Sequence, residues 1–141
     1  MTVYDLAIIG AGAAGTAAAS AMVKNNPLKK CAIIERESRP GGIMLQCIHS
    51  GFGLHYFKRE MTGPEYADEA FRRLRSVSGT NLDFFFNTMV ISVTADRKLL
   101  CNRDGENFSI EFQQLLLATG SREIPFGSLC IPSERPAGIF G

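Results

Sequence analysis

The chain has 141 residues, 45% of them hydrophobic, which is enough to bury the core of one domain. Its 15 basic and 14 acidic side chains give a net charge of +1, so the composition gives no sign of a surface for nucleic acid or another polyanion. The four cysteines, at positions 31, 47, 101 and 130, form no C-x-x-C pair, which argues against a zinc site and favours a reducing, cytoplasmic compartment.

The first 35 residues carry the strongest pattern in the chain. Residues 3–9 are an apolar, strand-forming run that leads directly into the loop Gly-Ala-Gly-Ala-Ala-Gly at 10–15. An Ala-rich helical stretch follows from residue 14 to about residue 23, and a second apolar run at 31–34 ends on Glu35. Strand, G-x-G-x-x-G loop, helix, strand and acid in this order predict a dinucleotide-binding βαβ unit.

Each residue type in this unit has its own expected role. Gly10 permits the tight turn out of the strand, Gly12 lets the backbone approach a pyrophosphate, and Gly15 lets the helix pack closely on the sheet. The amides at the helix N-terminus, at the positive end of its dipole, would face the phosphates. Glu35 would accept hydrogen bonds from a ribose diol and repel a 2′-phosphate, so we expect FAD or NAD rather than NADP. The alternative is a glycine turn in an α/β domain that binds no nucleotide.

The stretch from residue 6 to residue 23 is almost wholly apolar or small, as in a signal peptide or a membrane span. However, Asp5 precedes it, no basic segment stands before it, and three glycines interrupt it. We therefore expect no membrane span in this part of the chain.

The middle of the chain predicts a second glycine site and a capped helix. Gly41 and Gly42 follow a polar loop at 36–40, and they indicate either another close approach of backbone to ligand or a flexible turn into a buried helix. Residues 62–65, Thr-Gly-Pro-Glu, form a capping box with proline in the first helical turn. The helix predicted from there has apolar residues at helical spacing, three arginines on a solvated face and a stop at Gly79.

The pattern then changes to that of strands. Strands are expected from residue 82 onward, and residues 83–95 are rich in Phe, Val and Ile. Residues 97–102 and 107–112 predict a hairpin around the Asp-Gly turn at 104–105. Residues 114–120, Gln-Leu-Leu-Leu-Ala-Thr-Gly, predict a buried strand that ends in small residues.

The order of βαβ unit, glycine pair, helix, antiparallel meander and Ala-Thr-Gly strand resembles the FAD domain of the flavoproteins with two dinucleotide-binding domains, the pyridine nucleotide–disulfide oxidoreductase superfamily. The matching motifs are the loop at 10–15, Glu35, the glycines at 41–42 and Ala-Thr-Gly at 118–120. Residues 46–57, Gln-Cys-Ile-His-Ser-Gly-Phe-Gly-Leu-His-Tyr-Phe, are similar more narrowly to NAD/FAD oxidoreductases associated with anaerobic glycerol-3-phosphate dehydrogenases. Arg-Pro-Ala-Gly-Ile-Phe at 135–140 supports the same subgroup.

This resemblance implies an α/β fold, a Rossmann-like, mainly parallel sheet with helices on both faces and a β-meander, as an incomplete FAD-binding domain. Residues 1–121 would form the amino-terminal part of that domain, and 122–141 would be a connector toward an NAD(P)H-binding domain that the chain lacks. No metal site is expected, and no residue is assigned as a catalytic acid, base or nucleophile. The cofactor-binding residues that the resemblance implies are Gly10, Gly12, Ala13, Ala14, Gly15, Glu35, Arg36, Gly41, Gly42, Ile43, Gln46, Cys47, Val90, Ala118, Thr119 and Gly120.

One departure from the superfamily concerns its redox dithiol. Disulfide reductases of this kind carry C-x-x-x-x-C or C-x-x-C near the flavin, whereas Cys47 has no partner at either spacing. We therefore expect Cys47 to pack beside the flavin rather than to relay electrons. His49 and His55 are candidates for proton transfer near the flavin, with loop histidines whose hydrogen bonds are satisfied as the alternative.

The resemblance implies an FAD-dependent NAD(P)H oxidoreductase that passes electrons from NAD(P)H through FAD to a small-molecule or protein acceptor. A dehydrogenase subunit and a second copy of the chain are further partners to expect. Because the sequence holds one dinucleotide fingerprint, the 141-residue chain alone is expected to be inactive and to hold FAD weakly. The alternatives are a stand-alone, non-enzymatic dinucleotide-binding module or subunit, and a short dehydrogenase that uses the single fingerprint for NAD.

Overall fold

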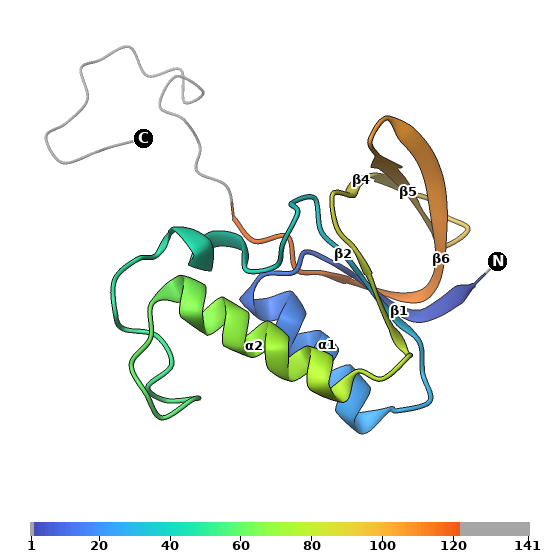
Figure 1. Ribbon diagram of the computed structural model, residues 1–141. Coiled ribbons are helices and arrows are strands. Elements are labelled where there is room, and N and C mark those ends of the chain that lie inside the picture. The colour runs from blue at the N-terminus through green and yellow to red at the C-terminus, as the bar shows by residue number, and fades with distance from the viewer. Residues whose placement is uncertain (1, 122–141) are drawn as a thin grey trace, which may run out of the picture.

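The computed structural model describes residues 2–121, which form one six-stranded sheet with helices packed against it (Figure 1). The spatial order of the strands is β3-β2-β1-β6-β5-β4. The strands are β1 (Val3–Ile9), β2 (Cys31–Ile34), β3 (Leu82–Phe85), β4 (Met89–Val93), β5 (Lys98–Arg103) and β6 (Glu106–Leu117). The helices are α1 (Ala13–Asn25), the 3₁₀ helix η1 (Gly42–Gln46) and α2 (Gly63–Val77). The predicted connector at 122–141 lies outside the described residues.

The four strands β1, β2, β3 and β6 are parallel, and their carboxyl ends meet at one edge of the sheet. Ile9 lies level with Ile34 on one side and with Leu117 on the other, and Ile34 lies level with Phe85. In open parallel sheets, ligands bind outside the carboxyl ends of the strands. The predicted Rossmann-like fold class is confirmed, and it places the glycine loop at this edge.

The last strand, β6, replaces two expected strands. We expected separate strands at 107–112 and 114–120, but β6 is continuous over Glu106–Leu117. Its first half pairs antiparallel with β5 and its second half pairs parallel with β1. Glu111, where the two ladders overlap, lies level with Lys98 on one side and Val3 on the other. The meander and the parallel sheet therefore share one strand.

The hairpin between β5 and β6 turns where the sequence predicts. Asp104 and Gly105 have φ values of +54° and +87°, and two successive left-handed residues are what a tight hairpin turn requires. Six residue pairs follow in unbroken register from the turn. The Asp-Gly signal therefore sets the pairing of the whole hairpin.

The run at 83–95 contains most of two strands, β3 and β4, separated by a turn at 86–88. Asn87 has a φ of +51°, and the Thr88 hydroxyl donates a hydrogen bond of 2.9 Å to the carbonyl of Phe86. Although β3 and β4 are consecutive in the chain, they form opposite edges of the sheet. Side chains that favour strands continue through the turn, which is why the sequence pattern conceals it.

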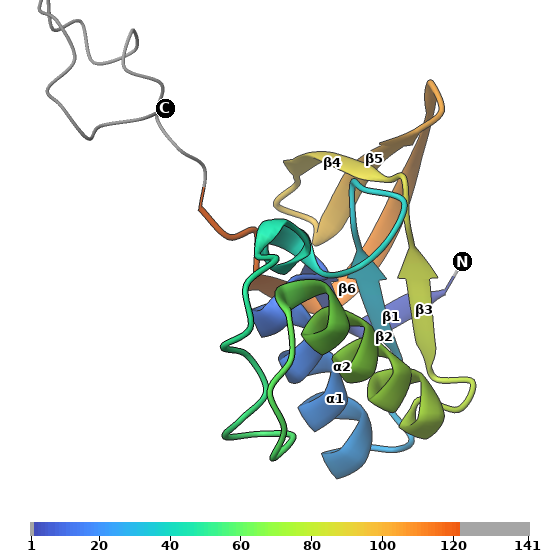
Figure 2. The same ribbon diagram turned by 60° about the vertical axis from the view of Figure 1, so that its left-hand side comes forward.

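Both α helices of the described residues lie on one face of the sheet, and the meander covers the other face (Figure 2). Ile33 and Ile34 point to opposite faces, as successive strand residues do. Within residues 2–121, the meander thus takes the place of the helices expected on the second face. The core on the helix face contains Ile8, Ala11, Ala19, Val23, Cys31, Ile33, Leu74 and Leu82. The core under the meander contains Tyr4, Ala7, Ala32, Ile34, Leu99, Cys101, Ile110 and Phe112.

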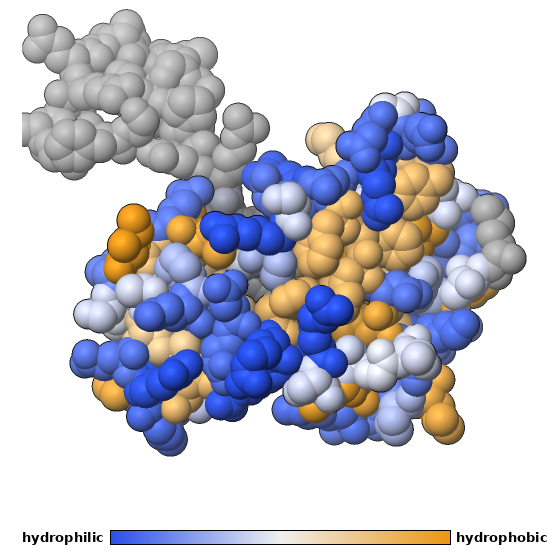
Figure 3. Space-filling model, viewed as in Figure 1, coloured by the Kyte–Doolittle hydropathy of each residue, from blue (hydrophilic) through white to orange (hydrophobic). Residues whose placement is uncertain are grey.

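The hydropathy of the surface differs between the helices and the region next to the meander. Hydrophilic side chains cover much of the helices, and an apolar area lies between the helices and the meander (Figure 3). Leu116 and Leu117, expected in a buried strand, are exposed and belong to neither core cluster. The prediction that this part of β6 is buried is therefore wrong for the described residues.

Helix α2 begins at the predicted capping box. The Thr62 hydroxyl accepts a hydrogen bond from the Glu65 amide, and the Glu65 carboxylate accepts one from the Thr62 amide at 2.7 Å. The hydrogen bonds that the Thr62 amide and hydroxyl donate to the Glu65 carboxylate lower its pKa. The helix ends at Val77, two residues before the stop expected at Gly79.

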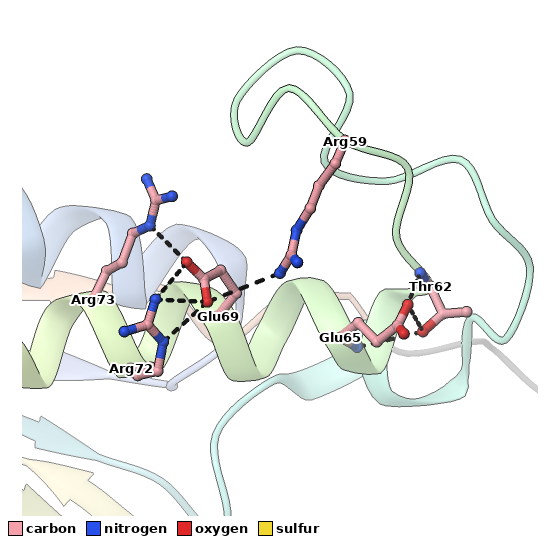
Figure 4. A network of polar contacts seen from close by, with 6 residues as sticks. All are labelled: Arg59, Thr62, Glu65, Glu69, Arg72 and Arg73. Atoms are coloured by element: carbon pink, nitrogen blue, oxygen red, sulfur yellow. Dashed lines mark hydrogen bonds and ion pairs between the residues drawn. The ribbon is translucent and has the colours of Figure 1, made fainter.

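Glu69 makes polar contacts with three arginines on α2 and in the loop before it (Figure 4). Its carboxylate accepts hydrogen bonds from Arg72 at 2.8 Å and from Arg73 at 2.9 Å, and it lies 4.0 Å from Arg59 in the preceding loop. The hydrogen bonds from Arg72 and Arg73 lower the pKa of Glu69 to about 2. The arginines remain exposed, as predicted for a solvated face. The Arg73 guanidinium also lies 4.4 Å from the Phe57 ring centroid, which ties the preceding loop to the helix.

Candidate functional site

The glycine loop joins the carboxyl end of β1 to the start of α1, and two of its glycines are required by packing. Gly10 has a φ of +104°, and a Cβ at this position would collide with the carbonyl oxygen of Ala118. A Cβ on Gly15 would collide with the carbonyl oxygen of Gly10. These contacts fit the expected tight turn and close helix packing, and they need no ligand to explain them.

Gly12 differs from its two neighbours in the loop. Its φ of −73° is accessible to any residue, and a Cβ built on it would meet no described atom within 4 Å. Neither backbone conformation nor packing within the described chain therefore requires glycine here. Gly12 is the N-cap of α1, and it makes no side-chain cap to the amides of the first turn. Open backbone and free amides at a helix N-terminus suit an anion such as a phosphate.

Glu35 directs its carboxylate at this loop from the end of β2. Oε2 accepts a hydrogen bond of 2.7 Å from the amide of Ala11, and Oε1 accepts one of 3.0 Å from the amide of Glu37. The side chain is buried, with 8% of the residue exposed. Because a carboxylate offers about four acceptor positions, it retains capacity for the hydroxyl groups of a ribose.

Ala11, which the sequence did not single out, joins three segments of the site. Its amide binds Glu35, while its carbonyl accepts hydrogen bonds from the amide of Gly41 at 2.9 Å and from the hydroxyl of Thr16 at 3.2 Å. In the sequence, its position between Gly10 and Gly12 was the one feature that could have marked Ala11 as part of the site. Its small side chain is fully buried in the core of the helix face.

The second glycine pair packs directly on the first loop. Gly41 has a φ of +129° and is buried, and a Cβ on it would crowd the side chain of Leu45. Gly42 has a φ of +54°, and its Cβ would lie 3.3 Å from Cα of Gly12. The pair packs its backbone against the glycine loop at 10–15, and it also leads into η1, where Met44 is buried. The positive φ of each residue favours glycine, most strongly at Gly41.

Two further expected residues lie on strands β6 and β4 or next to them. Ala118 follows β6, and its amide donates a hydrogen bond of 2.9 Å to the carbonyl of Ile9, so Ala118 lies beside the loop. Val90 belongs to β4 and packs against the core under the meander. The expected residues with exposed positions are Ala13, Ala14, Arg36, Gly42, Ile43, Gln46, Thr119 and Gly120.

The cysteines of the described residues are free thiols in different surroundings. Cys31 and Cys101 are buried, and burial raises the pKa of the Cys31 thiol to about 12 and that of Cys101 to about 11. Cys47 is partly exposed, and its Sγ lies 3.5 Å from the carbonyl oxygen of Ile43. Cys47 therefore has no thiol partner among residues 2–121.

The histidines stand apart from the glycine loop in the 47–61 segment. The His49 ring lies 5.4 Å from that of Phe52, and His55 is exposed. Among the described residues, no cluster of three or more His, Cys, Asp or Glu side chains is arranged to hold a metal ion. No helix between residues 2 and 121 is long and apolar enough to cross a membrane.

A curated protein matches most of the chain at low identity. Hydrogen cyanide synthase subunit HcnB of Pseudomonas aeruginosa is 28% identical over 130 residues, which cover 89% of this chain and 26% of that protein. The chain thus spans about a quarter of the curated relative that it matches.

Two solved structures share the fold at low identity. Thioredoxin reductase from T. acidophilum aligns with a TM-score of 0.68 at 19% identity, over 90% of this chain and 38% of that one. Thioredoxin reductase from Streptococcus pyogenes aligns with a TM-score of 0.67 at 24% identity, over 89% and 38%. Residues 4–139 match the sequence profile of the pyridine nucleotide-disulphide oxidoreductases, and the chain belongs to this family.

Proposed function

We propose that residues 1–121 form the amino-terminal part of an FAD-binding domain, and that 122–141 lead toward an NAD(P)H-binding domain. The intact protein would be a flavoprotein oxidoreductase that passes electrons from NAD(P)H through FAD to an acceptor. The observation that carries this proposal is the open backbone at Gly12 beside the carboxylate of Glu35. A ligand that approaches the backbone at Gly12 would account for glycine at that position.

Different residues of the site would hold different parts of the cofactor. The first-turn amides of α1, beside Gly12, would hold the pyrophosphate, and Glu35 would hold the adenosine ribose through its remaining acceptor positions. The Gly41–Gly42 backbone would enclose the pyrophosphate from the opposite side, since Gly42 packs on Gly12. FAD, when bound, would supply the hydride and electron chemistry.

We further propose that electrons leave the flavin without a protein dithiol. This is supported by the isolation of Cys47 and by the burial of Cys31 and Cys101. Cys47 would then be a packing residue beside the flavin. The acceptor would be a small molecule or a protein, including a dehydrogenase subunit as the similarity of residues 46–57 suggests, and a relative that is itself a subunit supports such a partner.

Calorimetric titration of the 141-residue chain with FAD, FMN and NADP tests the cofactor assignment. We expect FAD to bind most tightly, because FMN lacks the pyrophosphate and adenosine ribose and because NADP carries a 2′-phosphate that Glu35 repels. Gly12→Ala should weaken FAD binding about tenfold or more, since a displaced phosphate loses hydrogen bonds of about 1.5–3 kcal/mol. Equal or tighter binding of NADP would refute the assignment.

Gly51→Ala is the matched control for Gly12→Ala. Gly51 is also exposed, and a Cβ there would make only ordinary contact, 3.5 Å from the His49 ring. We expect this variant to bind FAD as the parent does. If the Gly12 variant also matches the parent, glycine at this position serves no ligand. Because one fingerprint is present, we expect no NADH oxidation by the chain alone, and flavoenzyme-like turnover would refute the division into two domains.

A further inference from the structure

We propose that Arg103, at the end of β5, is a positioning residue for the adenosine end of the dinucleotide site. This inference rests on the proposed function, because it concerns the surroundings of Glu35. Arg103 touches neither Glu35 nor the glycine loop in the recorded contacts. It acts through a chain of hydrogen bonds that runs from the meander to the carboxylate.

The first link joins Arg103 to the turn between β3 and β4. Its Nε donates a hydrogen bond of 2.9 Å to the hydroxyl of Thr88, a residue that is 1% exposed. The guanidinium also lies 5.6 Å from the ring centroid of Phe85 and 5.7 Å from that of Phe108. Among the described acids, none pairs with Arg103, so the hydroxyl and the two rings set its position.

The second link joins that turn to the segment carrying the acid. The amide of Thr88 donates a hydrogen bond of 2.9 Å to the carbonyl of Glu35, and the amide of Asn87 donates one of 3.0 Å to the carbonyl of Glu37. The backbone is therefore fixed on both sides of Arg36. The Glu37 amide, held in this way, is one of the two donors that orient the Glu35 carboxylate.

The side chain of Thr88 connects the turn to Arg103. Asn87, beside it, has a φ of +51°, in the left-handed region where asparagine is enriched among residues other than glycine. Thr88 supports the turn by donating to the carbonyl of Phe86 and by accepting from Arg103. A lysine at 103 has no Nε–H in a rigid guanidinium plane and could not reproduce this geometry together with the stacking.

Binding measurements on the full chain test this role with FAD and with ADP, which carries only the adenosine half. Arg103→Met removes the donor, and Thr88→Val removes the hydroxyl at nearly constant shape. Each should weaken FAD and ADP alike by about fivefold, the worth of one ordinary hydrogen bond. Thr88→Ser, which keeps the hydroxyl, and Arg75→Met, at an exposed position on α2, should stay within about twofold of the parent.

A double-mutant cycle with Glu35→Gln separates positioning from general stability. If Arg103 acts through the carboxylate, Arg103→Met should cost less than about twofold in the Gln background. Lower unfolding midpoints with unchanged affinities in Arg103→Met and Thr88→Val would show a merely structural role and overturn the inference. If the parent binds FAD and ADP and both variants match it, the inference alone fails. If the parent binds neither ligand, the proposed function fails and the inference falls with it.

Discussion

The structure gives Glu35 a role in the ligand-free fold in addition to the expected one toward a ribose. Its carboxylate holds the amides of Ala11 and Glu37. We therefore predict that Glu35→Ala lowers the free energy of unfolding of the chain without any cofactor present. The sequence alone gave the Glu35 side chain a ribose as its expected partner and no partner within the protein.

The expected size follows from the two donors. A hydrogen bond to a charged group contributes about 1.5–3 kcal/mol, and a buried donor left without a partner loses that contribution in full. Ala11 is fully buried, so its amide should account for most of the loss, whereas Glu37 is exposed and water can replace the carboxylate there. We expect about 2–3 kcal/mol for Glu35→Ala and about half of that for Glu35→Gln, which keeps one acceptor oxygen.

Urea unfolding of the ligand-free chain, followed by circular dichroism, measures this loss. With a dependence of about 1–3 kcal/mol per molar urea, the midpoint of the Ala variant should fall by roughly 1 M or more. Glu60→Ala, an exposed acid in the loop before α2, is the control and should shift the free energy by less than about 0.5 kcal/mol. An Ala variant as stable as the parent would show that Glu35 does not hold the glycine loop, and the geometry described for the site would then be wrong.

Three further predictions concern other parts of the chain. Thr62→Ala removes the capping box of α2 and should lower the free energy of unfolding by about 1 kcal/mol in the same assay, and an unchanged midpoint would contradict the cap. Glu69→Gln should destabilise the chain at neutral pH. Because the pKa of Glu69 falls from 4.5 to about 2 on folding, the difference from the parent should shrink below about pH 4.5 and vanish near pH 2, and a constant difference would refute the pairing. An alkylating reagent at pH 8 should modify Cys47 faster than Cys31 and Cys101, whose thiols are buried with raised pKa values; peptide mass spectrometry measures this, and equal rates would contradict their burial.

Local signals in the sequence predicted the βαβ unit and the elements that begin at a helix cap or at a tight turn. The run at 3–9 is a strand, Thr62 caps α2, and the Asp-Gly turn at 104–105 joins β5 to β6, because each depends on residues close together in the chain. The candidate site followed for the same reason: the loop at 10–15 and Glu35 are close in sequence, and the parallel pairing of β1 and β2 brings them together.

Features that depend on distant residues were not predictable in this way. Thr88 looks like any residue of a strand-forming run, and only its bonds to Glu35 and Arg103 mark it as the centre of a turn. The expected strands at 107–112 and 114–120 form parts of one strand, β6, because β5 pairs with its first half and β1 pairs with its second half. The helix-free second face likewise results from how the meander folds over the sheet, which no local pattern encodes.

The strand shared by the two halves of the sheet also constrains the order in which the chain folds. The β5–β6 hairpin has a two-residue turn, so it closes a short loop and can form within microseconds. Val3, by contrast, pairs with Glu111, and this contact must close a loop of more than a hundred residues at a larger entropic cost. During synthesis, β1 therefore cannot complete its pairing until residues 111–117 of β6 have emerged from the ribosome. We expect the β5–β6 hairpin to form first and β1 to pair with it afterwards.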